Sequence, residues 1–295
     1  MSEQQASGLQ KRRFEQPIDA GLTLRGEVTV QEIADGGVLP VVIMVHGFKS
    51  FMDWGFQPYA AAELARREYY VVRFNFSCNG VNERDFDELD KFAVNTYSRE
   101  QADLAVVWEL LQEKRLPFAE RADTGRVALL GHSRGGGNSI VFAAEHPDVQ
   151  AVVTWNGIAS ADLFDDAFKE ELARSGVAYV ANARTGQNMP IRQTFYDDLK
   201  QNAERFDITA RLAGLKTPVL SVQGDADSDR LKEDFRRLLE AAPDQAFVTI
   251  AGGTHTFGAV HPFAGTTPHL EEALEATLRF LDDRMRGTGE RGRQV

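Results

Sequence analysis

Short apolar runs alternate with amphipathic segments along most of the chain. Residues 41–45, Val-Val-Ile-Met-Val, form a continuous apolar run, which is typical of a central parallel strand buried on both faces. Residues 99–114 instead repeat their apolar side chains at helical spacing. By the same criteria we expect further strands at residues 14–18, 24–30, 70–74, 127–130, 149–154, 219–222 and 246–250, and further helices at residues 59–67, 136–145, 231–240 and 270–285.

This alternation predicts an α/β fold with a mostly parallel, doubly wound sheet. The first two strands are expected to form an antiparallel pair at its start. We assign residues 14–155 and 216–285 to the core. The polar ends of the chain, residues 1–13 and 286–295, are expected to be flexible.

The alternation is interrupted between residues 156 and 215. A helix at 162–174 and a hairpin with strands at 177–183 and 190–195 are expected there. A connection of about 60 residues is much longer than most loops. We therefore predict a cap inserted after the sixth core strand, and a surface insertion without a role at the site is the alternative.

Residues 131–135 read Gly-His-Ser-Arg-Gly and follow an apolar strand directly. This is the G-x-S-x-G pattern of a nucleophile elbow, a sharp turn from a strand into a helix. Gly131 and Gly135 would leave room for the close approach of the strand and the helix. The N-terminus of the helix would face the position where negative charge develops. Ser133 is therefore the predicted nucleophile.

A serine nucleophile needs a base, and the base needs an acid that orients it. Among the six histidines, His255 is favoured because it lies in a Gly-rich loop just after the last expected strand. The loop after the strand at 219–222 offers three aspartates, which could also build a turn or cap a helix. We favour Asp227 as the acid, with Asp225 as the alternative. The order Ser133, Asp227, His255 is the order of the elbow fold.

Residues 45–49, Val-His-Gly-Phe-Lys, end the strand at 41–45. A glycine there lets the chain turn tightly enough to aim the next backbone N–H at the reaction centre. The predicted oxyanion hole consists of the backbone N–H groups of Phe48 and Arg134. Because the donors are backbone groups, the side chains at these positions are not decisive.

Together with Trp-Gly-Phe at 54–56, Arg-Phe-Asn-Phe-Ser at 73–77 and Asn-Gly at 79–80, these motifs resemble the α/β-hydrolase superfamily over roughly residues 14–285. The chain looks most like bacterial esterases related to dienelactone hydrolase, of the feruloyl (cinnamoyl) esterase type. This resemblance implies an α/β-hydrolase fold with a cap between the sixth strand and the acid. It also selects Asp227, which lies three residues after the Gly of the acid loop. Dienelactone hydrolases themselves use a Cys nucleophile, whereas position 133 is Ser.

Composition narrows the classes of partner and location. The chain has 295 residues and a net charge of -11, which argues against binding to nucleic acid or to an anionic membrane. No apolar stretch approaches the roughly 20 residues that span a bilayer, and residues 1–13 lack the apolar region of a secretory signal. The single cysteine, Cys78, permits no internal disulfide. We expect a cytoplasmic protein.

The sequence thus predicts a serine hydrolase that cleaves a small-molecule carboxylic ester. No Cys/His cluster has zinc spacing and no G-x-G-x-x-G follows a strand, so no metal or cofactor is expected. An amide, peptide or thioester hydrolase could use the same triad. A non-catalytic binding protein could share the scaffold, although it would not need a nucleophile, a base, an acid and an oxyanion hole together. The oligomeric state stays open.

Overall fold

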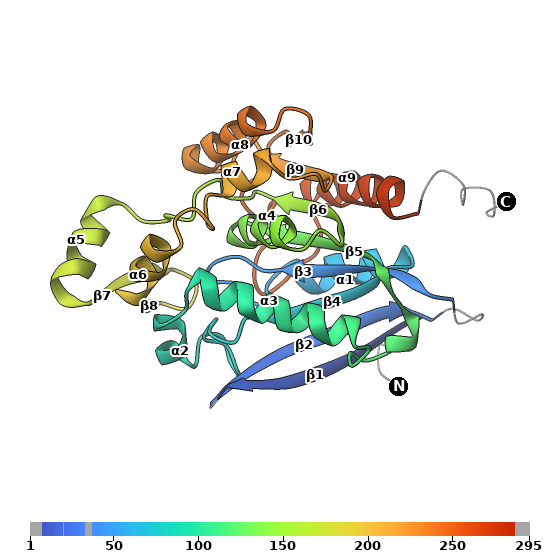
Figure 1. The fold of residues 1–295 in the computed structure, drawn as a ribbon, viewed down its shortest axis with the longest axis horizontal. Coiled ribbons are helices and arrows are strands. Elements are labelled where there is room, and N and C mark those ends of the chain that lie inside the picture. The colour runs from blue at the N-terminus through green and yellow to red at the C-terminus, as the bar shows by residue number, and fades with distance from the viewer. Residues whose placement is uncertain (1–7, 20, 33–36, 287–295) are drawn as a thin grey trace.

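The computed structural model of the protein describes residues 8–19, 21–32 and 37–286, and Figure 1 shows their arrangement. One sheet has the strand order β1-β2-β4-β3-β5-β6-β9-β10. These strands are β1 (Leu9–Asp19), β2 (Leu22–Gln31), β3 (Leu39–Val45), β4 (Tyr70–Asn75), β5 (Ala122–His132), β6 (Val149–Trp155), β9 (Val219–Gly224) and β10 (Ala246–Ile250). β2 pairs antiparallel with β1 and β4, and the other neighbours pair in parallel. The expected mostly parallel sheet is confirmed.

Helices cover both faces of this sheet (Figure 1). The helices are α1 (Gln57–Arg66), α3 (Tyr97–Gln112), α4 (Arg134–Glu145), α8 (Asp229–Ala241) and α9 (Pro268–Met285). Val41, Ile43 and Val45 of β3 pack in the core layer shared with α3, α4 and α8, whereas Val42 and Met44 pack in the layer shared with α1 and α9. Each such side chain contributes about 1.5–3 kcal/mol on burial. A strand buried on both faces explains the uninterrupted apolar run.

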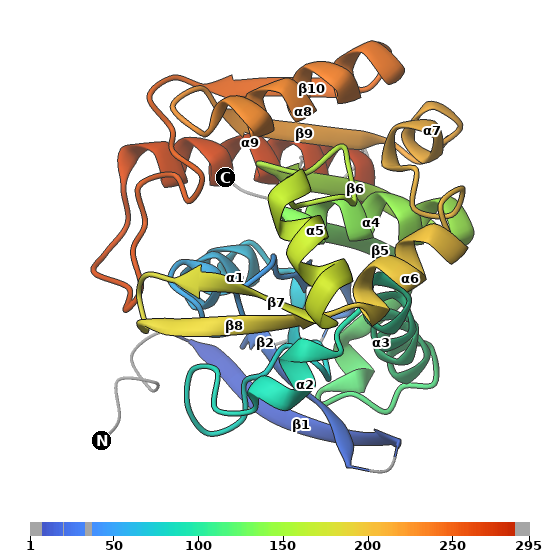
Figure 2. The same ribbon diagram turned by 90° about the vertical axis from the view of Figure 1, so that its left-hand side faces the viewer.

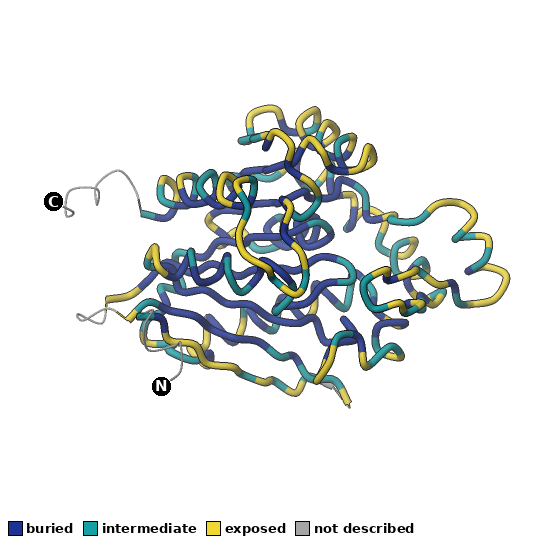
Figure 3. The backbone as a smooth tube through the Cα atoms, turned by 180° about the vertical axis from the view of Figure 1, so that it is seen from behind, coloured by how far each residue is buried: buried dark blue, intermediate teal, exposed yellow. Residues whose placement is uncertain are grey.

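The segment between β6 and β9 leaves the main sheet. It carries α5 (Asp166–Ser175), β7 (Val177–Asn182), β8 (Gln187–Arg192), α6 (Thr194–Gln201) and α7 (Ile208–Ala213). β7 and β8 form a separate antiparallel sheet, which lies with α5 and α6 at one end of the molecule (Figures 1 and 2). Figure 3 shows that much of this region is exposed, while the strands of the main sheet are buried. We call residues 156–215 the insertion.

The insertion differs in detail from the sequence-based prediction. β8 ends at Arg192, and Phe195 belongs to helix α6 rather than to the second hairpin strand. Neither α6 nor α7 was predicted, and the short helix α2 (Leu89–Ala93) in the core was missed as well. α5 begins at Asp166 instead of residue 162, because the side chain of Asp165 caps the helix by accepting from the N–H of Phe168.

Helix α7 lies within the range predicted as a cap, yet it packs against α4 and α8 of the core. It therefore completes the connection from β6 to the neighbouring parallel strand β9. The part of the insertion that projects from the core consists of α5, β7, β8 and α6.

Strand β1 extends into the range that was predicted to be a flexible N-terminus. Residues 9–13 pair with residues 27–31 of β2. Their polar composition was misleading, because an edge strand tolerates Lys and Arg where it faces solvent. Residues 1–7 of that range, and residues 287–295 of the predicted flexible tail, lie outside the described residues.

Candidate active site

The carboxyl ends of the parallel strands meet at one edge of the sheet. Val45 is in register with Gly131, and Gly224 is in register with Ile250. The segments that follow these ends carry all the predicted site residues, which are Phe48, Ser133, Arg134, Asp227 and His255. In open α/β sheets this edge is where ligands bind.

Ser133 occupies the turn between β5 and α4 with φ of 55° and ψ of -119°. Its N–H donates to the carbonyl of Trp155 at 2.8 Å. The flanking glycines make this turn possible. A Cβ atom on Gly131 would lie 2.2 Å from the carbonyl oxygen of Gly135, and one on Gly135 would lie 2.1 Å from that of Val45. Both positions therefore require glycine for steric reasons, as the elbow motif predicts.

Asp227 and His255 lie in contact although 28 residues separate them in the sequence. His255 Nδ1 is 2.8 Å from Asp227 Oδ2. The Asp227 side chain is almost fully buried, whereas the His255 side chain is 38% exposed. Burial opposes ionisation of Asp227, but the hydrogen bonds from His255, from Gln223 and from the N–H of Ser228 outweigh it and hold the pKa of this carboxyl below its usual value. An ionised carboxylate is thus hydrogen-bonded to an imidazole that reaches solvent.

The alternative acid has a different role. Asp225 Oδ1 accepts from the N–H of Gly252 at 2.6 Å, so this side chain braces the start of the loop that carries His255. Helix α8 is capped by Ser228, whose hydroxyl accepts from the N–H of Leu231. Asp225 therefore stabilises the turn and Ser228 caps the helix. Asp227 has neither of the structural roles expected for these aspartates.

Asn156, which the sequence-based analysis did not single out, holds the acid and base loops together. It is fully buried, with φ of 48°. Its Oδ1 accepts from the N–H of Gly224 at 2.8 Å, and its Nδ2 donates to the carbonyl of His255 at 2.9 Å. Asparagine tolerates the left-handed conformation, so its place directly after a strand was the one feature of the sequence that could have pointed to Asn156.

The loop after β3 lies directly against the nucleophile turn. A Cβ atom on Gly47 would be 3.0 Å from both the carbonyl oxygen of His132 and the Cβ of Ser133. Phe48 follows Gly47, and its ring centroid is 5.8 Å from the guanidinium carbon of Arg134. The two residues predicted to form the oxyanion hole are therefore neighbours beside Ser133.

A buried ionic network, also missed by sequence reasoning, supports the start of α4. The Arg134 side chain is 2% exposed, and its Nε donates to Glu100 Oε2 at 2.9 Å. Glu100 also accepts from Asn138 at 2.5 Å and from Asn95 at 2.7 Å. The guanidinium lies over the ring of Tyr97, with its carbon 4.1 Å from the ring centroid. The partners come from α3, α4 and the segment before α3, so no single motif reveals them.

Two further histidines in the motifs are structural. Burial lowers the pKa of His46 to about 4 and that of His132 to about 3, so both imidazoles are neutral at pH 7. His46 Nδ1 is 2.9 Å from the carbonyl oxygen of Gly47. His132 Nε2 is 2.8 Å from the carbonyl oxygen of His255. They brace the loop after β3 and the loop that carries His255, respectively.

The insertion contacts the oxyanion loop through aromatic rings. The Phe48 ring lies 5.8 Å from that of Phe164, which in turn stacks on Phe168 at 4.1 Å. Phe195 of α6 lies 5.7 Å from Phe164. These aromatic residues of the insertion therefore form one cluster with Phe48.

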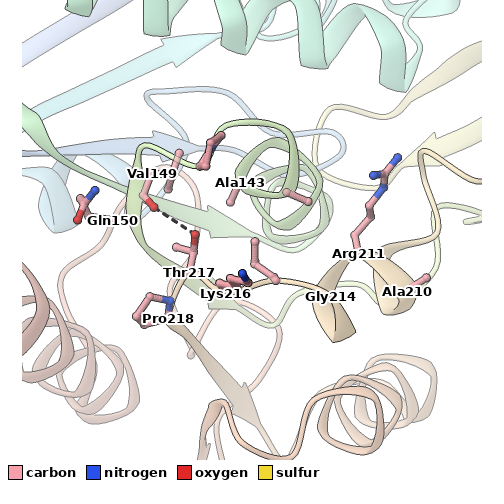
Figure 4. A pocket seen from close by; sticks show the side chains of 12 residues that line it. Ala143, Val149, Gln150, Ala210, Arg211, Gly214, Lys216, Thr217 and Pro218 are labelled. Carbon is pink, nitrogen blue, oxygen red and sulfur yellow. Dashed lines mark hydrogen bonds between the residues drawn. The ribbon is translucent and has the colours of Figure 1, made fainter.

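A cavity of about 560 Å³ lies elsewhere, at the amino ends of β6 and β9 (Figure 4). Thr217 and Val149 line it, and the Thr217 hydroxyl donates to the carbonyl of Val149. Because the predicted site residues follow the opposite, carboxyl ends of the strands, this cavity is separate from the candidate active site.

The described residues offer neither a metal site nor a membrane-spanning helix. Among the described residues, no group of three or more His, Cys, Asp and Glu side chains is arranged to hold a metal ion. None of the helices in that part of the chain is both long enough and apolar enough to cross a membrane.

A model of the alpha/beta hydrolase family matches residues 42–267. The chain therefore belongs to the alpha/beta hydrolase family. The match spans all the predicted site residues, and the resemblance expected from the motifs is confirmed at the level of the family. A search of curated protein sequences gives no match.

Solved structures with the same fold include several esterases. Est1E from Butyrivibrio proteoclasticus, with ferulic acid bound, has a TM-score of 0.68 and 18% identity, over 92% of this chain and 99% of that one. The esterase domain of a Rhodothermus marinus protein has a TM-score of 0.61 and 17% identity, over 94% and 98%. A putative dienelactone hydrolase from Klebsiella pneumoniae has a TM-score of 0.57 and 14% identity, over 92% and 98%. At these identities the likeness establishes the fold.

Proposed function

We propose that this protein is a serine hydrolase that cleaves carboxylic esters through an acyl-enzyme. The contact between Asp227 and His255, at the same sheet edge as the strained Ser133 turn, carries the proposal. An ester is favoured as substrate because Est1E with its bound ferulic acid and the Rhodothermus esterase domain share this fold.

In the proposed reaction, Ser133 Oγ attacks the ester carbonyl while His255 Nε2 takes its proton. Asp227, hydrogen-bonded to Nδ1, fixes the tautomer and stabilises the imidazolium. The N–H groups of Phe48 and Arg134 stabilise the oxyanion, and losing one such donor typically costs about 10²–10³ in rate. The alcohol leaves with the proton from His255. Water, deprotonated by His255, then releases the acid and regenerates Ser133.

The insertion is proposed to act as a cap that selects substrates. Its aromatic cluster of Phe164, Phe168 and Phe195 adjoins Phe48, whose backbone N–H belongs to the proposed oxyanion hole. An apolar or aryl acyl group bound at the oxyanion hole would then lie beside these rings.

A fluorophosphonate probe tests the class of protein, and a substrate panel tests the bond cleaved. We expect one equivalent of probe to attach to Ser133, as measured by intact mass and peptide mapping, and Ser133→Ala to remain unlabelled. Matched butyrate esters, thioesters and amides should be cleaved in that order of preference, with the ester first. Absence of labelling in a folded protein would favour a binding protein, and faster amide or thioester cleavage would favour the other hydrolase classes.

A further inference from the structure

Lys49, the residue after Phe48, is a half-buried cation in the proposed oxyanion loop. Its Nζ donates to the carbonyl of Ala181 on β7 at 3.0 Å and lies 5.9 Å from the Phe48 ring centroid. Within residues 8–19, 21–32 and 37–286, no Asp or Glu forms an ion pair with it. An ammonium group has three N–H donors, and the carbonyl takes one of them.

Other cations near this edge of the sheet are neutralised by carboxylates. Arg134 pairs with Glu100, and Arg184 of the insertion pairs with Asp85 at 2.6 Å. The chain has 44 acidic and 33 basic residues, so the missing partner of Lys49 does not reflect a shortage of acids. Burial lowers the pKa of the Lys49 ammonium, and a carboxylate beside it would compensate for the lost hydration.

The position of Lys49 suits contact with a substrate. Gly47 packs against the Cβ of Ser133, and two residues of chain span at most about 7 Å. From there the Lys49 side chain reaches the carbonyl of Ala181, so the ammonium lies between the proposed oxyanion loop and β7. Lys49 also has φ of 53°, in the left-handed region that favours Gly or Asn.

We infer that Lys49 binds a carboxylate of the substrate, so that the preferred substrates are esters that also carry a free carboxylate. Half-esters of dicarboxylic acids and acyl esters of hydroxy acids both have this chemistry. The inference rests on the proposed function, because it requires ester cleavage at Ser133. A charge-assisted hydrogen bond of this kind contributes about 10- to 100-fold in affinity.

The test compares matched esters that differ only in the carboxylate. Monoethyl glutarate is compared with ethyl butyrate for a carboxylate on the acyl side. O-butyryl lactate is compared with the same ethyl butyrate for a carboxylate on the alcohol side. For each pair the ratio of kcat/KM, anionic over neutral, is measured by acid release at low and high salt. One of the pairs should give a ratio well above one, which falls as salt rises.

Three variants test whether Lys49 causes this preference for anionic esters. Lys49→Met should lower the ratio by about 10- to 100-fold, and Lys49→Arg should retain most of it. The matched control is Lys169→Met, because Asp162 already neutralises Lys169 at 2.6 Å, and its ratio should equal that of the parent. Thermal unfolding of each variant checks the fold.

The outcomes separate the two proposals. If Lys49→Met slows both members of a pair equally, Lys49 is only a link between the oxyanion loop and β7, and the inference is wrong. Cleavage of neutral esters by the parent with no anionic preference overturns the inference alone. If the parent cleaves no ester of either kind and Ser133 is not labelled, the proposed function and the inference both fail.

Discussion

The sheet edge that carries the candidate triad and the insertion beside it are held in place by different interactions. At the sheet edge, backbone packs against backbone. Gly131 and Gly135 fit against carbonyl oxygens, and a Cβ on Gly224 would lie 2.1 Å from the carbonyl oxygen of Gly253. The insertion instead contacts the core through side chains, such as Arg184 on Asp85 and Gln187 on the carbonyl of Phe86.

This difference indicates which part of the molecule tolerates substitutions. Close backbone contacts leave no room for a side chain at these glycines, so steric contacts fix the geometry of the nucleophile turn. Side-chain contacts at a half-exposed surface contribute only about 0–1 kcal/mol for each ion pair. The sheet edge therefore fixes the geometry of the candidate triad, whereas the insertion tolerates substitutions, as expected of the proposed substrate-selecting cap.

The largest expected effect comes from the nucleophile. Ser133→Ala should lower ester turnover by about 10⁶-fold. The change keeps Cβ, so the strained turn is as well accommodated as before, and thermal unfolding should be unchanged. Activity within tenfold of the parent would rule out Ser133 as the nucleophile.

The next effect separates two aspartates of the same loop. Asp227→Asn should lower kcat by about 10⁴-fold, because the amide can favour the wrong tautomer of His255. Asp225→Asn is the matched control, and it should cost far less, because Asp225 bonds only the N–H of Gly252 among the hydrogen bonds described. A reversed order in steady-state kinetics would make Asp225 the acid.

Two glycines test the steric contrast directly. Gly135→Ala should destabilise the fold by more than about 4 kcal/mol, because the new Cβ would meet the carbonyl oxygen of Val45. Gly176→Ala, at the end of α5, should cost only about 1 kcal/mol, which is the penalty of φ at 75° with open space around the Cβ. Chemical denaturation measures both. Similar losses would show that the insertion is as tightly constrained as the sheet edge.

The smallest effect concerns selectivity. Phe164→Ala should change the ratio of kcat/KM between ferulate and acetate esters by about tenfold, because a ring beside Phe48 is removed. Phe247→Ala is the control, since its ring packs on Phe235 of α8 rather than on Phe48 or Phe164. A uniform loss on both esters would mean that the insertion does not select substrates.

Local patterns were enough to predict the core and to single out Ser133 and His255, whereas the choice of Asp227 over Asp225 also used the family resemblance. A strand buried on both faces leaves an uninterrupted apolar run, and the elbow needs glycine at fixed positions. By contrast, α6 and α7 are short, and only a few of their residues are buried, so their periodicity was too weak to detect. Asn156 and Glu100 act through contacts between segments far apart in the chain, and no local pattern encodes such contacts.

The parallel pairing of β6 and β9 limits which part of the insertion could be replaced by a segment from another hydrolase. The chain leaves the carboxyl end of β6 and must enter β9 at its amino end, so it has to cross the height of the sheet, about 20 Å. Helix α7, about 9 Å long, makes part of that crossing against α4 and α8, and the segments on either side of it make the rest. A graft from another hydrolase that replaces α5 to α6 and retains α7 would therefore keep the topology. A graft that also removes α7 would have to supply a crossover of its own before β9 could form.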